Sequence, residues 1–274
     1  FGQTGPRSIM QLDGGEFTVT GDGSIAFGVN TPFTFSQTGG IFDIRSKTDA
    51  NLSNQGGTFS EMKLGGGTFR ADNATFYIGV RDDGAMTVSG TADVRIKELR
   101  LGRIYAAINS TLNLDGGSLT LSDDLLRDTS EHASINLNGG KLVAAGTFTV
   151  EDDAALTTTV EAGGAKIEVA SGQTLTFNEL FEDAGDGGGL TKSGAGSLIL
   201  GAANEYTGDT LIEGGTLSIS EAYLDTNSTV RISSGASFDL AFSGDNTVQA
   251  LYLGGVQQDA GTWGSSSSGA VHVD

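Results

Sequence analysis

A Gly-Gly pair followed by an alternating apolar run recurs along this chain of 274 residues. The runs are GGEFTV at Gly14, GGIFDI at Gly39, GGTFRA at Gly66, GGSLTL at Gly116, GGKLVA at Gly139, GGAKIEV at Gly163 and GGTLSI at Gly214. Successive pairs are separated by about 25 residues or by about twice that distance. A repeat of this length is typical of solenoids, in which each coil must stack on its neighbours to bury its apolar face.

Glycine also marks the two places where the spacing doubles. Gly90 lies midway along one long step, and the cluster Gly187-Gly188-Gly189 lies midway along the other. The pair Gly56-Gly57 is out of register and is interpreted as a second corner of its coil. Corners that stack at about 4.8 Å leave little room for side chains and often need a positive φ, which glycine adopts most freely.

The runs between the glycines have the periodicity of strands. Phe42 and Ile44 would share one face, and the intervening positions of such runs are mostly Thr, Ser, Asp or Lys. This alternation predicts strands with one face inward and one face in solvent. The stretch 92–108 alternates in the same way, whereas 178–184 is a candidate for one inserted turn of helix.

The sequence therefore predicts an all-β fold, a right-handed parallel β-helix (solenoid) of about 11 coils with a period of about 25 residues. A coiled solenoid makes parallel neighbours without helical crossovers, and no convincing helix separates the runs. We expect one β-helical domain over 1–274, with a closing coil or cap over 236–274. A β-sandwich or barrel is the alternative, but those folds show turn signals roughly every 8–12 residues without a longer repeat.

Composition excludes some classes of partner. The 15 Lys and Arg residues against 34 Asp and Glu residues give a formal net charge of −19, which disfavours nucleic acid and anionic membranes. There is no Cys, so neither disulfides nor thiolate metal sites are expected. No apolar run reaches the roughly 18 residues of a membrane span. The chain opens at Phe1 without a Met or a signal peptide, which favours a processed product or a piece of a longer protein.

The stretch 190–220 carries a more specific pattern. Its ordered positions are Leu190, Lys192, Gly194, Gly196, Leu198, Leu200, Asn204, Tyr206, Gly208, Thr210, Ile212, Gly214, Gly215, Thr216 and Leu217. This pattern resembles the autotransporter-associated β-strand repeat, also called the passenger-associated transport repeat. The close resemblance covers about one coil and implies a β-helical passenger region exported to the bacterial surface. The ending at 251–269 is similar to the closing segment of large repeat-bearing secreted proteins.

Acidic residues supply the first candidates for chemistry. Pairs occur at Asp82-Asp83, Asp123-Asp124 and Asp152-Asp153, and a glycine-rich stretch runs over 183–189. Carboxylates at the corners of a β-helix would suit Ca²⁺ or acid–base chemistry on a polysaccharide. The pairs do not follow the repeat, and the glycine-rich stretch lacks the spacing of calcium loops, so solvated turns are the favoured interpretation.

A basic group is the second candidate. It consists of Arg95, Lys97, Arg100 and Arg103. These residues would either pair with acidic residues of neighbouring coils or bind an anionic glycan, and pairing on a solvated exterior contributes little stability.

Five other side chains have a functional and a structural interpretation. His132 and His272 have no second histidine nearby in the sequence, which argues against a metal site or a triad base. Asn204 and Tyr206 would face a ligand or, as favoured here, fill a turn and pack over a neighbouring coil. Trp263 is expected to plug the last coil rather than to stack on a sugar.

These observations favour a non-catalytic extracellular protein with a structural or adhesive role at a bacterial surface. No catalytic, cofactor-binding or metal-binding residue is assigned. Self-association through coil ends or lateral faces, including end-to-end fibres, and binding to cell-surface or matrix components are compatible with such a rod. The alternatives are a polysaccharide lyase or hydrolase, for which Arg81, Asp82 and Asp83 are the first residues to test, and a trimeric phage-like fibre.

Overall fold

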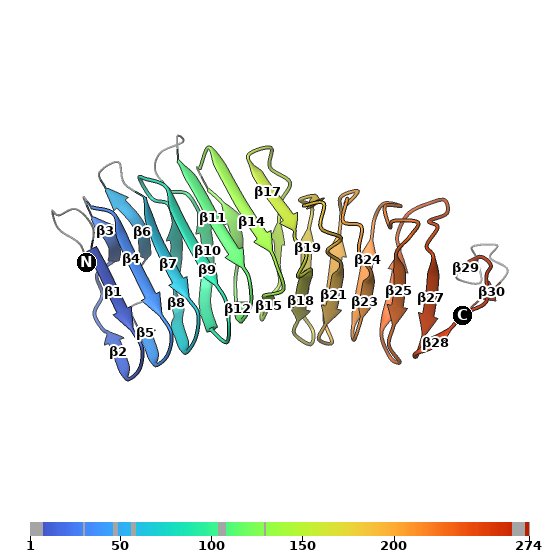
Figure 1. The fold of residues 1–274 in the computed structure, drawn as a ribbon, viewed down its shortest axis with the longest axis horizontal. Helices are drawn as coiled ribbons and strands as arrows, with labels where there is room; N and C mark the ends of the chain where they lie inside the picture. The colour runs from blue at the N-terminus through green and yellow to red at the C-terminus, as the bar shows by residue number, and fades with distance from the viewer. Residues whose placement is uncertain are drawn as a thin grey trace.

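The computed structural model describes residues 8–29, 31–45, 49–55, 59–103, 108–128, 130–264 and 272–273. Within these ranges the chain forms strands and turns and no helix. The strands stack side by side into an elongated coil, with β1 near one end and β27 near the other (Figure 1). The expected all-β solenoid of parallel coils is therefore confirmed. The pair Gly56-Gly57 lies outside the described residues.

The first sheet takes one strand from each of eight successive coils in the described residues. In order of pairing, its strands are β1 (Ser8–Leu12), β4 (Phe33–Gln37), β7 (Ser60–Leu64), β9 (Gly84–Val88), β11 (Asn109–Leu114), β14 (His132–Leu137), β17 (Leu156–Val160) and β20 (Phe181–Asp183). All of these neighbours are parallel.

The central sheet runs the length of the solenoid. Its parallel path is β2 (Glu16–Val19), β5 (Ile41–Ile44), β8 (Thr68–Ile78), β10 (Asp93–Leu101), β12 (Ser118–Leu121), β15 (Lys141–Ala144), β18 (Ala165–Val169), β21 (Leu190–Ser193), β23 (Thr210–Ile212), β25 (Thr229–Ile232) and β27 (Ala250–Leu253). After it, β28 (Val256–Gln257) pairs antiparallel with β27.

A third face closes each coil. It begins with β3 (Ile25–Val29), β6 (Ala50–Gln55), the second halves of β8 and β10, and β13 (Leu125–Arg127). It continues as a separate sheet of β16 (Phe148–Val150), β19 (Thr174–Phe177), β22 (Ser197–Leu200), β24 (Thr216–Ile219) and β26 (Ser237–Leu240). Since β13 contacts β16, the two parts follow one another along the solenoid.

The number of turns is about nine, with a period of roughly 24 residues, against the predicted 11 coils of about 25 residues. The central sheet has eleven parallel levels in the described residues, but only eight of them also have a strand in the first sheet, which ends at β20. The sequence pattern followed the levels of the central sheet and did not show that one face ends earlier. At the far end β28 folds back on β27, and in the described residues β29 (Trp263–Gly264) pairs with β30 (His272–Val273).

Glycine builds the corner between the first and central sheets. A Cβ on Gly67 would lie 2.4 Å from the carbonyl oxygen of Gly40, and φ at Gly67 is +73°. Gly90 stacks in the same way on Gly65, with its Cβ position 2.4 Å from the Gly65 oxygen. The Gly189 oxygen lies 2.9 Å from where a Cβ of Gly164 would be. The two midway glycine positions predicted from the sequence therefore do belong to this corner.

The sequence pattern placed Gly214-Gly215 on the same corner, and this is wrong. A Cβ on Gly215 would lie 2.2 Å from the Gly196 oxygen, on the corner between the central sheet and the third face. The run GGTLSI accordingly forms β24 of the third face, whereas the central-sheet strand of that coil is β23. Both corners stack backbone on backbone, so the same Gly-Gly signal serves either one.

The inward faces form one apolar core. Phe17, Phe42 and Phe69 are directly in register on β2, β5 and β8, as the alternation predicted. The rings of Phe17 and Phe42 are stacked at a centroid distance of 5.2 Å, and those of Phe42 and Phe69 at 5.5 Å. In the part of the chain with the resemblance, Leu198 and Leu200 of β22 are fully buried as well.

The stretch 178–184 is not a turn of helix. It contains β20, in which Phe181 pairs with Thr158 of β17. The Phe181 ring packs edge-on against Phe177 at 5.0 Å, so tertiary packing decides the conformation over local propensity. The described part of 92–108 contains the strand β10, as expected. None of the described residues lies in a helix long and apolar enough to cross a membrane.

We expect Gly67→Ala to destabilise the protein by about 2–4 kcal/mol. Alanine would need a left-handed backbone conformation there and would also place its Cβ against the backbone of the preceding coil. Gly172→Ala is a matched control, because φ is +76° at that position but no atom lies within 4 Å of the Cβ site. Its expected cost is about 1–2 kcal/mol. Urea unfolding measures both, and equal losses would mean that corner stacking adds nothing.

Candidate binding surface

The basic group singled out in the sequence is neutralised by carboxylates. Its ion pairs join Arg95 to Asp93, Lys97 to Asp123, Arg100 to Glu98 and Asp128, and Arg103 to Asp49. The Arg103 guanidinium also lies 4.3 Å from the ring centroid of Tyr77. These contacts support the pairing interpretation, since a glycan acid would have to displace a carboxylate at each of the four positions.

The acidic pairs stabilise corners. Asp83 accepts a hydrogen bond of 2.7 Å from the backbone N–H of Asn109 in the next coil. Asp153 accepts a hydrogen bond of 3.0 Å from the Ala155 N–H and forms an ion pair with Arg127. The hydrogen bond from Arg127 lowers the pKa of the Asp153 carboxyl group. Among the residues that the structure describes, no three His, Asp or Glu side chains are grouped so that they could hold a metal ion. The favoured interpretation as turn residues therefore fits these contacts.

The glycine-rich stretch over 183–189 is also a turn. Asp183 accepts hydrogen bonds from the Gly185 N–H at 2.8 Å and from the Thr207 hydroxyl at 2.7 Å. His132 is exposed at the start of β14. Trp263 lies in β29, which pairs with β30 and not with β27, and its indole N–H donates to the Asp259 carbonyl at 3.2 Å. This pairing does not place Trp263 as a plug on the last parallel strand.

Asn204 and Tyr206 lie inside the solenoid, on the side where the first sheet has ended at β20. Asn204 accepts a hydrogen bond of 2.8 Å from the Phe181 N–H of the preceding coil, and its amide donates to the Ala202 carbonyl at 2.9 Å. The Tyr206 hydroxyl lies 2.9 Å from Thr210 Oγ1, and burial raises the pKa of Tyr206 to about 12. Both side chains are committed to packing, so neither faces a ligand.

Lys192 was missed as an inward residue. It is fully buried on β21, and its ammonium donates to the carbonyl oxygens of Ser193, Gly194 and Gly214 at 2.7, 2.9 and 3.0 Å. Burial lowers the pKa of Lys192 to about 8. The side chain thus ties two neighbouring corners of the third face together. A lysine at an alternating position would ordinarily be assigned to the solvent face.

We expect Glu179→Gln to raise stability by about 1–3 kcal/mol at pH 7.5 and to leave it unchanged at pH 4. Glu179 is buried, it accepts a hydrogen bond of 3.2 Å from the Asp153 N–H, and burial raises its pKa to about 7. The pKa of Glu179 is higher in the folded state, about 7, than in the unfolded state, about 4.5. The contribution of this carboxyl group to stability is therefore fully present below about pH 4.5 and is lost as the pH rises through 7. Urea midpoints at both pH values test this, with the exposed Glu221→Gln as the control for charge removal. Equal effects of Glu179→Gln at pH 4 and pH 7.5 would contradict the assignment.

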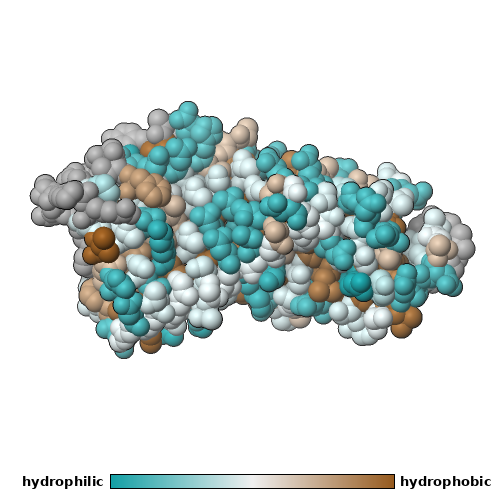
Figure 2. Space-filling view, in the orientation of Figure 1, coloured by the Kyte–Doolittle hydropathy of each residue, from teal (hydrophilic) through white to brown (hydrophobic). Residues whose placement is uncertain are grey.

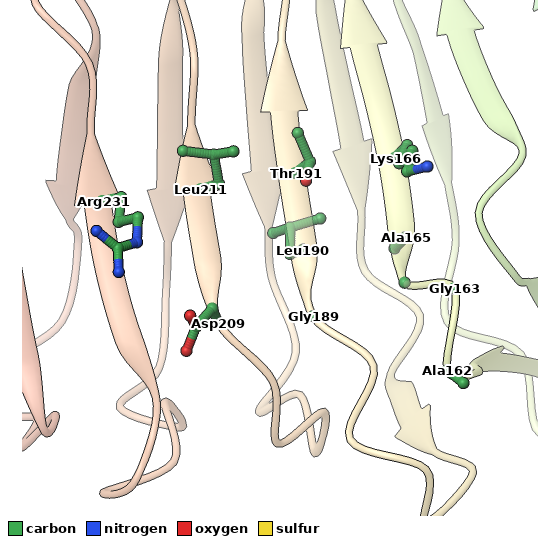
Figure 3. Close-up of a pocket in the computed structure, with 11 residues that line it drawn as sticks. Ala162, Gly163, Ala165, Lys166, Gly189, Leu190, Thr191, Asp209, Leu211 and Arg231 are labelled. Carbon is green, nitrogen blue, oxygen red and sulfur yellow. The ribbon is translucent and has the colours of Figure 1, made fainter. Parts of the chain in front are cut away.

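A shallow depression of about 290 Å³ opens on the outer side of the central sheet. Lys166, Thr191, Leu211 and Arg231 lie along it in one row, in register on β18, β21, β23 and β25 (Figure 3). The corner beside the row is made of small residues, namely Ala162, Gly163, Gly164, Ala165 and Gly189. Because stacked glycine corners carry no side chains, this part of the surface is hollow.

The ends of this row carry positive charge. Lys166 and Arg231 are exposed, and neither forms a salt bridge in the part of the chain that the structure describes. The Arg231 guanidinium instead lies 4.0 Å from the ring centroid of Tyr252. Asp209, the carboxylate that lines the depression, accepts a hydrogen bond of 2.7 Å from the Thr229 N–H. The depression therefore has two positive charges against the one negative charge of Asp209, a locally positive balance on a chain of net charge −19.

Sequence reasoning did not identify this row. Lys166 and Arg231 are far apart in the sequence, and neither belongs to a basic cluster. A signal was nevertheless present. Lys166 and Thr191 each stand two residues after the glycine of their corner, Gly164 and Gly189, so an alignment of successive coils places them on neighbouring strands.

Comparison with known proteins supports the resemblance. Residues 190–219 match the family model of the passenger-associated-transport-repeat. The chain is 33% identical over 230 residues to the adhesin BmaC autotransporter of Brucella suis biovar 1, an alignment that covers 80% of this chain and 6% of the adhesin. The chain thus spans only a small part of the length of that relative. No solved structure matches the chain.

Proposed function

We propose that this chain is a segment of a non-catalytic, extracellular β-solenoid with an adhesive role at a bacterial surface. The observation that carries the proposal is the similarity over most of the chain to an adhesin autotransporter, together with a passenger-associated transport repeat. A secreted or surface location follows from the same similarity. The fold supports the role, because a rod of parallel coils presents long faces on a rigid backbone.

The placement of the polar side chains supports a role without catalysis. Of the residues first considered for a polysaccharide-active enzyme, Asp83 is held by the Asn109 N–H and Asp82 is only 9% exposed. Acid–base catalysis on a glycan needs two carboxyl groups that converge on an open groove. The pairs at Asp123 and Asp153 are instead engaged by Lys97 and Arg127.

The exterior is suited to contact with hydrated partners. The face seen in Figure 2 is mostly hydrophilic or neutral, with small and scattered apolar patches. Such a surface binds through hydrogen bonds and a few charges rather than through one large apolar patch. End-to-end stacking is not part of this proposal, because β28 runs antiparallel along β27 and pairs with Tyr252 and Leu253 at that edge of the central sheet.

Adhesion is tested with the purified chain coupled to fluorescent beads. The beads are applied to animal cell monolayers and to immobilised matrix components, and retained beads are counted after washing. We expect retention well above that of albumin-coated beads, with competition by the soluble chain. Beads coated with heat-unfolded chain control for non-specific contact. Retention no greater than that of albumin on every surface would overturn the proposal, as would the release of reducing ends from a glycan panel.

A further inference from the structure

We infer that the row Lys166–Thr191–Leu211–Arg231 binds an acidic oligosaccharide whose charges are widely spaced carboxylates. This inference rests on the proposed adhesive function, because it names the class of ligand that the function would recognise. It is carried by two exposed, unpaired positive charges that border the same depression. The basic group that begins at Arg95 offers no such unpaired charge, since each of its four members has a carboxylate partner.

The positive side chains on neighbouring coils are less accessible to a ligand than Lys166 and Arg231. Lys141 precedes Lys166 in the same row, and its ammonium lies 2.8 Å from Glu168 Oε2. Lys192 points inward and is fully buried. Positive charge that is open to a ligand is therefore found at Lys166 and Arg231, three levels of the central sheet apart. Three levels correspond to about 14 Å along the solenoid axis.

Arg231 is arranged to hold a carboxylate. Its guanidinium lies over the Tyr252 ring at 4.0 Å, and this contact restrains the side chain without neutralising it. A planar guanidinium with free N–H groups binds a carboxylate in a bidentate manner, and prior ordering lowers the entropy cost of binding. Lys166 has three donors on a flexible stem, so it accepts a second carboxylate over a range of positions.

The residues between the two charges suit a sugar chain. The half-buried Thr191 offers a hydroxyl, and the half-buried Leu211 offers an apolar surface. The small residues of the neighbouring corner leave room for a bulky, non-planar ligand that lies on the sheet. A sugar ring presents both hydroxyl groups and C–H groups, so an oligosaccharide along the row can contact both side chains between its acidic groups.

The overall charge selects among acidic ligands. At a net charge of −19, the chain repels polymers of high charge density, such as nucleic acids and densely sulfated glycans. A neutral glycan would leave both cations without a partner. The ligand must therefore have a low charge density and must still offer a carboxylate to each of the two cations. A glycan in which uronic acids alternate with neutral sugars meets both requirements, because it has few negative charges and they are spaced apart.

The test uses hyaluronan fragments, which alternate glucuronic acid with a neutral sugar, as the probe on the whole chain. Binding is measured by calorimetry at low and at physiological salt. We expect saturable binding that weakens with salt, and a loss of at least about tenfold in affinity in the double variant Lys166→Gln/Arg231→Gln. The matched control is Lys63→Gln/Lys97→Gln, which removes two exposed positive charges that are already paired with Glu61 and Asp123. Its expected change is less than about twofold.

Several outcomes would overturn the inference. These are no hyaluronan binding by the native chain at low salt, an equal loss in the two double variants, or tighter binding of heparin or dextran than of hyaluronan. Circular dichroism and urea midpoints confirm that the variants are folded. Bead adhesion separates this inference from the proposed function. If the Lys166→Gln/Arg231→Gln beads adhere as well as the native ones, the row is not the adhesive site, although adhesion itself stands.

Discussion

Replacing Phe42 by alanine is expected to lower the free energy of unfolding of the N-terminal coils by about 3–5 kcal/mol. Phe42 is fully buried, and its ring is nearly parallel to those of Phe17 and Phe69, with interplanar angles of 16° and 7°. Phe35 adds an edge-on contact at a centroid distance of 5.0 Å. Each neighbour is fixed to its own coil by backbone pairing, so the cavity left by the missing ring cannot close.

Phe17→Ala is the matched control for Phe42→Ala. Phe17 is half-buried and stacks on Phe42 from the end of the ladder. Its removal is expected to cost about 1–2 kcal/mol, because a partly exposed side chain buries less area and leaves no closed cavity. Solenoids open in parts, so hydrogen exchange of the β5 amides reports the local effect alongside urea unfolding. A loss below about 1 kcal/mol at Phe42 would show that the ladder relaxes around the gap.

The position of Phe42 illustrates why the fold could be predicted from the sequence. A parallel solenoid returns each coil to the same faces, so Phe42 and its counterparts on other coils occupy equivalent inward positions. Alternation within a run then decides which side chains point inward. What the pattern could not decide is the corner to which a glycine pair belongs. Gly214-Gly215 and Gly39-Gly40 look alike in sequence but stack on different corners.

The candidate surface was harder to predict because it depends on pairing between coils. Arg103 belongs to a basic group in the sequence, yet its partner Asp49 lies on another coil and is revealed only by the fold. Lys166 and Arg231 are isolated in the sequence and come to lie in one row on the same face, three levels apart, through the register of the central sheet. A charge is available to a ligand only when no carboxylate of an adjacent coil neutralises it. Local sequence does not contain that information.

Tyr206 also shows that local sequence does not reveal the surroundings of a side chain, in this case a buried polar one. In the sequence its ring was compatible with a ligand contact or with packing. In the structure it is 1% exposed and lies edge-on to the Tyr223 ring at a centroid distance of 5.8 Å. It fills the interior on the side where the first sheet has ended, so packing there depends on side chains rather than on strand pairing.

We therefore expect Tyr206→Ala to lower the free energy of unfolding of the coils around β23 by about 3–5 kcal/mol. The loss combines a large cavity with a Thr210 hydroxyl that no longer has its tyrosine partner. Tyr206→Phe keeps the ring and removes only that hydrogen bond, so its expected cost is about 1 kcal/mol. Urea unfolding and hydrogen exchange of the β23 amides measure both variants.

The difference between the two Tyr206 variants decides the role of the residue. If packing is its role, the ring carries most of the effect, and Tyr206→Phe retains both stability and bead adhesion. If Tyr206→Phe abolished adhesion while stability was unchanged, the hydroxyl would have to reach a ligand from inside the solenoid. That outcome would require the coil around Tyr206 to open on binding, because a hydroxyl that is buried and bonded to Thr210 cannot contact a partner on the closed surface.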